Sequence, residues 1–269
     1  MMKLKTKPVT LPEIKSNVGN ERQFYKAIMK LIRDMQDDIN QTLIKEYRAS
    51  AQREKLAMDG VADWVAHVVE YLTDQWSIKL DDLATKMATQ FIDSTVNSYD
   101  KSLLKHLRDA GFTVRFQMTP YMSDVLKASV AENVGLIKSI ASGHLDKVQM
   151  YVWQSVSNGY DLAGLTKNLK HEYGITQRRA ARIASDQANK AHAEYESARR
   201  QELGIKKAIW LHSHAGKKPR PSHVAAHGKT FDVVKGMYLD GQWVKPGQLI
   251  HCRCGSKAII DEGVLLNVA

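Results

Sequence analysis

The sequence predicts an α+β protein in which a long helical N-terminal region precedes a small C-terminal unit rich in strands and loops. Two observations support this fold class. Apolar residues recur at spacings of three and four through most of residues 20–203, as on the buried stripe of a helix. After Gly204 this period gives way to glycine, proline, histidine and short β-prone pieces. At 269 residues, the chain is long enough to bury a sizeable core.

The clearest helix begins near Asn20, and its apolar stripe is Phe24, Ile28, Leu31, Ile32, Met35, Ile39 and Leu43. Asp59-Gly60 is expected to interrupt the helical run. A second stripe follows, which includes Leu80, Leu83, Met87 and Phe91 and continues to a C-terminal cap at Gly111. Residues 112–118 alternate apolar and polar side chains, which predicts a short strand or an extended linker.

Helical spacing resumes near Val125 and is expected to pause at Ser142-Gly143 and to stop at Gly174. An Ala- and Arg-rich helix then runs from Gln177 to about Leu203, where Gly204 closes it. Three β-prone pieces follow, at residues 208–211, 242–244 and 256–260.

These changes of pattern divide the chain into four expected parts. They are a basic flexible arm at residues 1–19, a helical region at 20–124, a second helical part at 125–204, and a β-rich His/Cys unit at 205–269.

Composition excludes several classes of protein. Hydrophobic residues make up 43% and charged residues 25%, close to globular averages, and no apolar run approaches the length of a bilayer-spanning helix. Residues 1–12 lack the apolar core of a signal peptide, so we expect synthesis and residence to begin in the cytosol.

Positive charge is concentrated in one stretch of the chain. The net charge is +10, and residues 176–229 contain 12 Lys or Arg against 4 Asp or Glu. Such a surplus favours contact with the phosphates of double-stranded DNA without sequence reading, although Arg199 and Arg200 also suit a helix C-terminus. The expected DNA-binding residues are Arg178, Arg179, Arg182, Lys190, Lys217 and Lys218.

Half of the histidines and both cysteines lie between residues 212 and 254. Imidazole and thiolate are the ligands that zinc prefers, and a metal can replace a missing core in a loop-rich segment. The first candidates are Cys252 and Cys254, then His223, with His227, His214 or His251 at a fourth position. The alternative is that the two cysteines pack as small apolar groups and that the histidines make ordinary hydrogen bonds.

A catalytic use of this cluster needs a general base. The segment His223-Val-Ala-Ala-His227 lacks the glutamate of the HExxH pattern, and the nearest acids, Asp232 and Asp240, form no familiar arrangement. A metal-dependent nuclease or another effector enzyme therefore stays the alternative hypothesis. No catalytic residue is predicted.

Several segments together carry a family resemblance. They are the Ala/Arg-rich helix, Gly204-Ile205 with Trp210, the run from Arg220 to Gly228, and His251-Cys252-Arg253-Cys254. In this order they resemble the phage head-morphogenesis proteins of the Mu protein F-like minor head group, over roughly residues 125–260. Some members carry Cys-x-x-Cys where this chain has residues 220–223, so the resemblance implies that His223 replaces one ligand, whereas Arg220 cannot bind a cation.

The resemblance implies a minor component of the virion, located in the head interior and in the host cytoplasm during assembly. It implies association with the portal protein and with a capsid or scaffolding protein, and it leaves DNA contact and ejection with the genome open. It also implies structural roles for Trp210, Arg220, Gly228 and Arg253 around the Cys-x-Cys turn.

Overall fold

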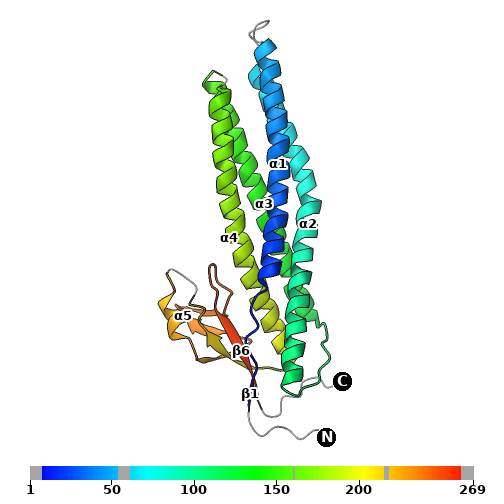
Figure 1. Ribbon diagram of the computed structural model, residues 1–269, viewed down its shortest axis with the longest axis vertical. Coiled ribbons are helices and arrows are strands. Elements are labelled where there is room, and N and C mark those ends of the chain that lie inside the picture. The colour runs from blue at the N-terminus through cyan, green and yellow to red at the C-terminus, as the bar shows by residue number, and fades with distance from the viewer. Residues whose placement is uncertain (1–7, 54–60, 160, 215–217, 262–269) are drawn as a thin grey trace. The chain divides into compact units, whose positions relative to one another are not determined.

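The computed structural model describes residues 8–53, 61–159, 161–214 and 218–261. Over these residues it combines long helices with short strands, which confirms the α+β prediction (Figure 1). The elements in chain order are β1 (Val9–Thr10), α1 (Val18–Arg53), α2 (Val61–Asp109), α3 (Pro120–Ser157), α4 (Leu162–Glu202), β2 (Lys207–Leu211), α5 (Pro221–Ala225), β3 (Thr230–Asp232), β4 (Met237–Leu239), β5 (Gln242–Val244) and β6 (Gly255–Ile260). The expected break at Asp59-Gly60 lies outside the described residues.

The chain divides into two compact units. Unit 1 comprises Met1–Glu21, Gln90–Val130 and Ser185–Ala269, and unit 2 comprises Arg22–Thr89 and Ala131–Ala184. Each long helix therefore contributes residues to both units. The division of the sequence into four consecutive parts stays a prediction.

Unit 2 has a core of helix-borne apolar side chains. The predicted stripe of α1 is confirmed, because every member from Phe24 to Leu43 is at most 5% exposed. On α2 the prediction is partly wrong. Leu83 is 38% exposed, and the fully buried row instead contains Ala84 and Ala88. Small side chains occupy these positions where neighbouring helices pack closely.

The expected interruptions at Ser142-Gly143 and Gly174 are wrong, since α3 and α4 are continuous through them. A glycine inside a helix costs only about 1 kcal/mol. Burial of Ala141 and Leu145 beside one glycine and of Thr176 beside the other offsets that cost. Gly143 also leaves room for a neighbour, since a Cβ there would lie 3.0 Å from the Arg179 guanidinium.

A buried histidine links three helices of unit 2. His144 on α3 is 1% exposed. Its Nε2 lies 2.8 Å from Gln36 Oε1 on α1 and its Nδ1 3.0 Å from Thr176 Oγ1 on α4. Because the amide oxygen can only accept, Nε2–H donates to it and the neutral ring accepts from the threonine hydroxyl at Nδ1. Burial lowers the pKa of His144 to about 4.

This lowered pKa predicts acid sensitivity. Below the ordinary histidine pKa of about 6.5, His144 is protonated in the unfolded chain but stays neutral in the folded protein until the pH approaches 4. Stability is therefore complete above about pH 6.5 and is lost as the pH falls towards 4, by up to about 3 kcal/mol. Urea unfolding at pH 7 and pH 4.5 should show a smaller loss in His144→Gln than in the wild type. The exposed His67→Gln serves as control, and equal losses in wild type and His144→Gln would contradict the assignment.

In unit 1, two helices end at the expected glycines. Gly111 and Gly204 have φ values of 85° and 74°. After α2, the Phe112 N–H donates to Leu107 O and the Gly111 N–H donates to Arg108 O. After α4, the Ile205 N–H donates to Arg200 O and the Gly204 N–H donates to Gln201 O. This is the Schellman arrangement, which needs a left-handed residue after the helix and so favours glycine. Residues 112–118 form an extended segment without a strand.

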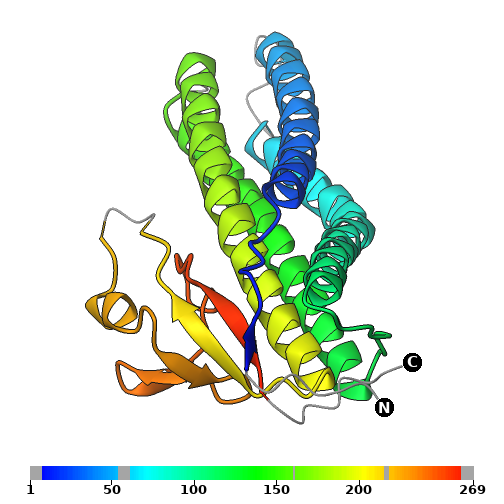
Figure 2. The ribbon, with the colours of Figure 1, turned by 60° about the horizontal axis from the view of Figure 1, so that its bottom comes forward.

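The predicted C-terminal strands are confirmed. β1, β6, β2 and β3 form an antiparallel sheet in that order, and β4 and β5 pair as a separate hairpin. Figure 2 shows β1 beside β6 and the C-terminal part of α4 alongside the sheet. The expected flexible arm is therefore wrong for residues 8–19. β1 pairs with β6, and Leu11 and Ile14 enter the unit 1 core. Residues 1–7 lie outside the described part of the chain.

A second core cluster of unit 1 fills the region between β2, β3 and the loop before β6. Trp210 is its largest member and is fully buried. The cluster contains Ala208, Trp210, Ala226, Phe231, Val233, Val244, Cys252 and Cys254. Among the described helices, none is long and apolar enough to cross a membrane.

Candidate metal centre

Three predicted ligands converge inside this second cluster. His223 lies on α5, and Cys252 and Cys254 lie on the loop that leads into β6. His223 Nδ1 is 3.5 Å from Cys252 Sγ and 3.7 Å from Cys254 Sγ. Nδ1 and the two Sγ atoms all lie within 4.8 Å of one another, and the residues are 3%, 4% and 9% exposed. No carboxylate belongs to this group in the described part of the chain.

The short helix α5 places the imidazole. Pro221 occupies its first turn, which suits a residue without a backbone N–H, and Arg220 precedes it with an extended backbone. The His223 ring packs edge to face on Trp210 with 5.1 Å between centroids. Arg220 Nη2 donates to Ile250 O at 3.0 Å, which ties the start of α5 to the cysteine loop.

A turn after α5 holds Trp210 in place. Gly228 has a φ of 78°, a conformation that favours glycine. Its N–H donates to Trp210 O, and the Trp210 N–H donates to Lys229 O, both at 2.8 Å. These two hydrogen bonds fix the backbone of Trp210, whose indole packs against the His223 ring.

A tight turn places the two sulfurs. Pro246 and Gly247 occupy its centre, and the Gln248 N–H donates to Lys245 O. Gly247 has a φ of 84°, and a Cβ there would lie 3.1 Å from the Ala193 Cβ of α4. Its N–H donates to Cys252 Sγ at 3.4 Å. The Pro-Gly pair is a turn signal that sequence reasoning left unused at this site.

Two further contacts anchor the loop to α4. The backbone N–H of His251 donates to Asp186 Oδ1 at 3.0 Å, and its ring Nδ1 lies 3.2 Å from the same oxygen. Arg253 Nη2 lies 3.5 Å from Ser185 Oγ. Sequence reasoning missed Asp186 and Ser185, because nothing local in a helix more than sixty residues away marks them as partners of the loop.

The two buried cysteines shift each other's pKa in opposite directions. A hydrogen bond from the Cys254 thiol lowers the pKa of Cys252 to about 5, against burial, which raises it. The same hydrogen bond, burial and the charge on Cys252 raise the pKa of Cys254. The backbone N–H of Ser213 acts in the opposite direction on Cys254. Trp210 Nε1 makes no direct hydrogen bond within the described residues.

The other candidate histidines lie outside the group of three. His227 Nδ1 accepts the backbone N–H of His212 at 3.0 Å, and His212 Nδ1 accepts that of His214 at 3.3 Å. Neutral rings that accept at Nδ1 carry their proton on Nε2, so neither His212 nor His227 offers a free lone pair in this arrangement. His251 has a side chain that is 68% exposed and faces Asp186.

The predicted DNA-binding residues fall in both units. Arg178, Arg179 and Arg182 are exposed on the unit 2 part of α4. In unit 1, Lys218 is exposed, and Lys190 Nζ lies 3.8 Å from Glu194 Oε1. Lys217 lies outside the described residues.

Two other arginines of the basic stretch do not face solvent. Arg199 and Arg200, which the sequence analysis associated with the C-terminus of the helix, are each 3% exposed. Arg200 Nη2 donates to Glu196 Oε1 and its Nη1 to Ser256 Oγ, both at 2.6 Å, which joins α4 to β6.

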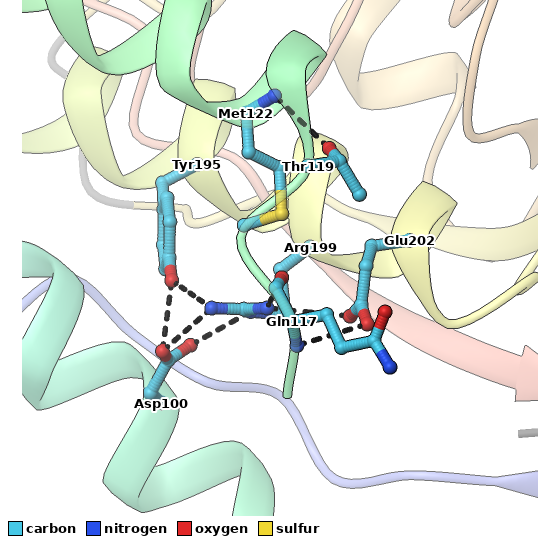
Figure 3. A network of polar contacts seen from close by, with 7 residues as sticks. All are labelled: Asp100, Gln117, Thr119, Met122, Tyr195, Arg199 and Glu202. Atoms are coloured by element: carbon cyan, nitrogen blue, oxygen red, sulfur yellow. Dashed lines mark hydrogen bonds and ion pairs between the residues drawn. The ribbon is translucent and has the colours of Figure 1, made fainter. Parts of the chain in front are cut away.

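Arg199 is the centre of a polar network in unit 1 (Figure 3). Its guanidinium donates to both carboxylate oxygens of Asp100 on α2, at 2.9 and 3.1 Å, and to Gln117 O at 2.8 Å. Tyr195 Oη donates to Asp100 Oδ2, and Arg199 also contacts Glu202 at 3.3 Å. The network fixes the extended segment after α2 against α4.

Comparison with known proteins bears on the segment that carries this centre. The family model described as "Phage Mu protein F like protein" matches residues 146–256. The resemblance predicted from the sequence is confirmed. The matched segment includes Trp210, His223, Cys252 and Cys254.

A relative from Haemophilus influenzae, named only as an uncharacterized protein, is 32% identical over 158 residues. The alignment covers 59% of this chain and 34% of the relative, so the chain spans about a third of that protein's length. No solved structure matches the chain.

Proposed function

We propose that this chain is a phage head-morphogenesis protein, a minor component of the virion. The match of residues 146–256 to the Mu protein F-like family carries this proposal. The group of His223, Cys252 and Cys254 supports a structural use of the C-terminal unit, because no carboxylate that could act as a general base belongs to it in the described part of the chain. The two acids nearest in sequence to the cluster have other hydrogen-bond partners, which gives the enzyme hypothesis no support. Asp240 accepts a hydrogen bond from Ser222 Oγ. Asp232 accepts from the backbone N–H groups of Val234 and Lys235.

Loss of the gene tests this proposal. Deletion from a strain that produces particles should leave heads that are absent, aberrant or without DNA in electron micrographs of lysates. Supply of the wild-type chain in trans should restore normal heads. Normal, DNA-filled heads from the deletion strain would contradict an essential role in head assembly.

Within this function, we propose that the chain associates with the portal protein and with a capsid or scaffolding protein in the head interior. The face of α2 in unit 2 supports a protein contact. Tyr71 and Ile78 lie seven residues apart on one helix face and are 60% and 71% exposed. Co-purification with tagged portal protein should be weakened by a Tyr71→Ser/Ile78→Ser double variant. Thr73→Ala, at an exposed position on another face of the same helix, serves as control.

Contact with packaged DNA is a further part of the proposal. Three exposed arginines within five residues of α4 suit backbone phosphates, and each phosphate contact contributes about 0.9 to the slope of log K against log salt. Arg178→Ala/Arg179→Ala/Arg182→Ala should weaken duplex binding and reduce this slope by up to about 3. A matched variant, Lys101→Ala/Lys105→Ala/Arg115→Ala, changes the net charge equally at exposed positions elsewhere. Equal affinity and slope for both variants would remove the assignment.

A further inference from the structure

We propose that His223, Cys252 and Cys254 bind one zinc ion through Nδ1 and the two Sγ atoms, with solvent as the fourth ligand. The spacing of the ligand atoms is the first support. Zn–S bonds of about 2.3 Å and Zn–N bonds of about 2.0–2.1 Å, at a tetrahedral angle, place nitrogen and sulfur ligands about 3.6 Å apart. The observed Nδ1 to Sγ distances are 3.5 and 3.7 Å. These two distances match those between a nitrogen and a sulfur bound to the same tetrahedral zinc ion.

The chemistry of the ligands selects the metal. Two thiolates and an imidazole suit zinc better than magnesium or calcium, which prefer oxygen ligands. Binding requires both cysteines as thiolates, so the ion displaces the remaining thiol proton or protons to solvent, and its two positive charges balance the two sulfurs.

The surroundings are arranged for such an ion. Gly247 donates its N–H to Cys252 Sγ at 3.4 Å. Hydrogen bonds to coordinated atoms orient ligands and tune a metal site. The apolar cluster with Trp210, Phe231 and Val233 keeps the ligand side chains buried.

Among the residues that the structure describes, the group of ligands stops at three. His227 and His212 both accept backbone N–H groups at Nδ1, so their Nε2 atoms carry the ring protons. His251 is held by Asp186, outside the group of three. Solvent therefore completes the tetrahedron, and the ion links α5 to the loop before β6.

Elemental analysis of the full-length protein, purified under reducing conditions without chelator, tests the site. About one equivalent of zinc is expected in the wild type. Cys252→Ser, Cys254→Ser and His223→Ala should each lose most of it. His227→Ala and His251→Ala are matched controls that should keep it. Zinc below about a tenth of an equivalent in the wild type overturns the proposal, and so does loss of zinc in either control.

Cobalt substitution in the wild-type protein avoids dependence on variants that fail to fold. The expected spectrum has thiolate-to-cobalt charge-transfer absorption and the intense visible bands of a tetrahedral site. Absence of both bands, or an intact mass lower by two hydrogens that reveals a Cys252–Cys254 disulfide, contradicts the site. Because these readouts do not depend on particle assembly, the metal site and the proposed function can fail separately.

Discussion

Replacement of Arg199 by alanine should lower the free energy of unfolding by about 3–5 kcal/mol. The guanidinium is 3% exposed and compensates the carboxylates of Asp100 and Glu202, whose side chains are 20% and 2% exposed. Its removal leaves these charges in a largely dry environment and also frees Gln117 O from a hydrogen bond. The loss is large because a buried charge without a partner costs more than an intact pair contributes.

Urea unfolding followed by circular dichroism measures this effect. Arg115→Ala, at an exposed position of the neighbouring extended segment, should change the unfolding free energy by no more than about 0.5 kcal/mol. If Arg199→Ala does not fold, Arg199→Lys provides the comparison, because it keeps the charge but cannot contact Asp100 with two nitrogens. A loss below about 1 kcal/mol in Arg199→Ala would show that the network does not hold the α2–α3 connection.

The second large effect concerns the proposed zinc ion. Removal of the ion by a chelator should lower the midpoint of thermal unfolding by about 5–10 °C, because apolar packing and the Arg220 hydrogen bond to Ile250 must then hold α5 and the cysteine loop together. Added zinc should restore the midpoint. Cys254→Ser should start at the lower value and respond to neither treatment. A wild-type midpoint that is insensitive to the chelator, in protein shown to have lost its zinc, would mean that the ion is not structural.

Local patterns predicted much of the fold. The α1 stripe, the glycine-terminated helix ends at Gly111 and Gly204, and the strands of the C-terminal unit each depend on residues close in sequence. The failures depend on distant partners. Gly143 and Gly174 stay helical because other helices bury their neighbours, and β1 forms because β6 offers an edge to residues about 250 positions away.

The candidate site shows the same division. His223, Cys252 and Cys254 stood out because their residue types are rare and gather in a loop-rich segment, and the structure brings these three together. The sequence could not exclude the fourth candidate, since the lone pair at His227 Nδ1 is taken up by the backbone N–H of His212. Nor could charge alone separate the exposed Arg178 from the buried Arg199, whose partner Asp100 is 99 residues away.

The central claim is that this chain works inside the head as a component of the virion. Mass spectrometry of heads purified from the strain that encodes the chain tests this most directly, with the host lysate as comparison. We expect its peptides in the heads, in fewer copies than the major capsid protein, and still present after a high-salt wash. Heads that contain no such peptides, while the lysate contains the intact protein, would contradict the account.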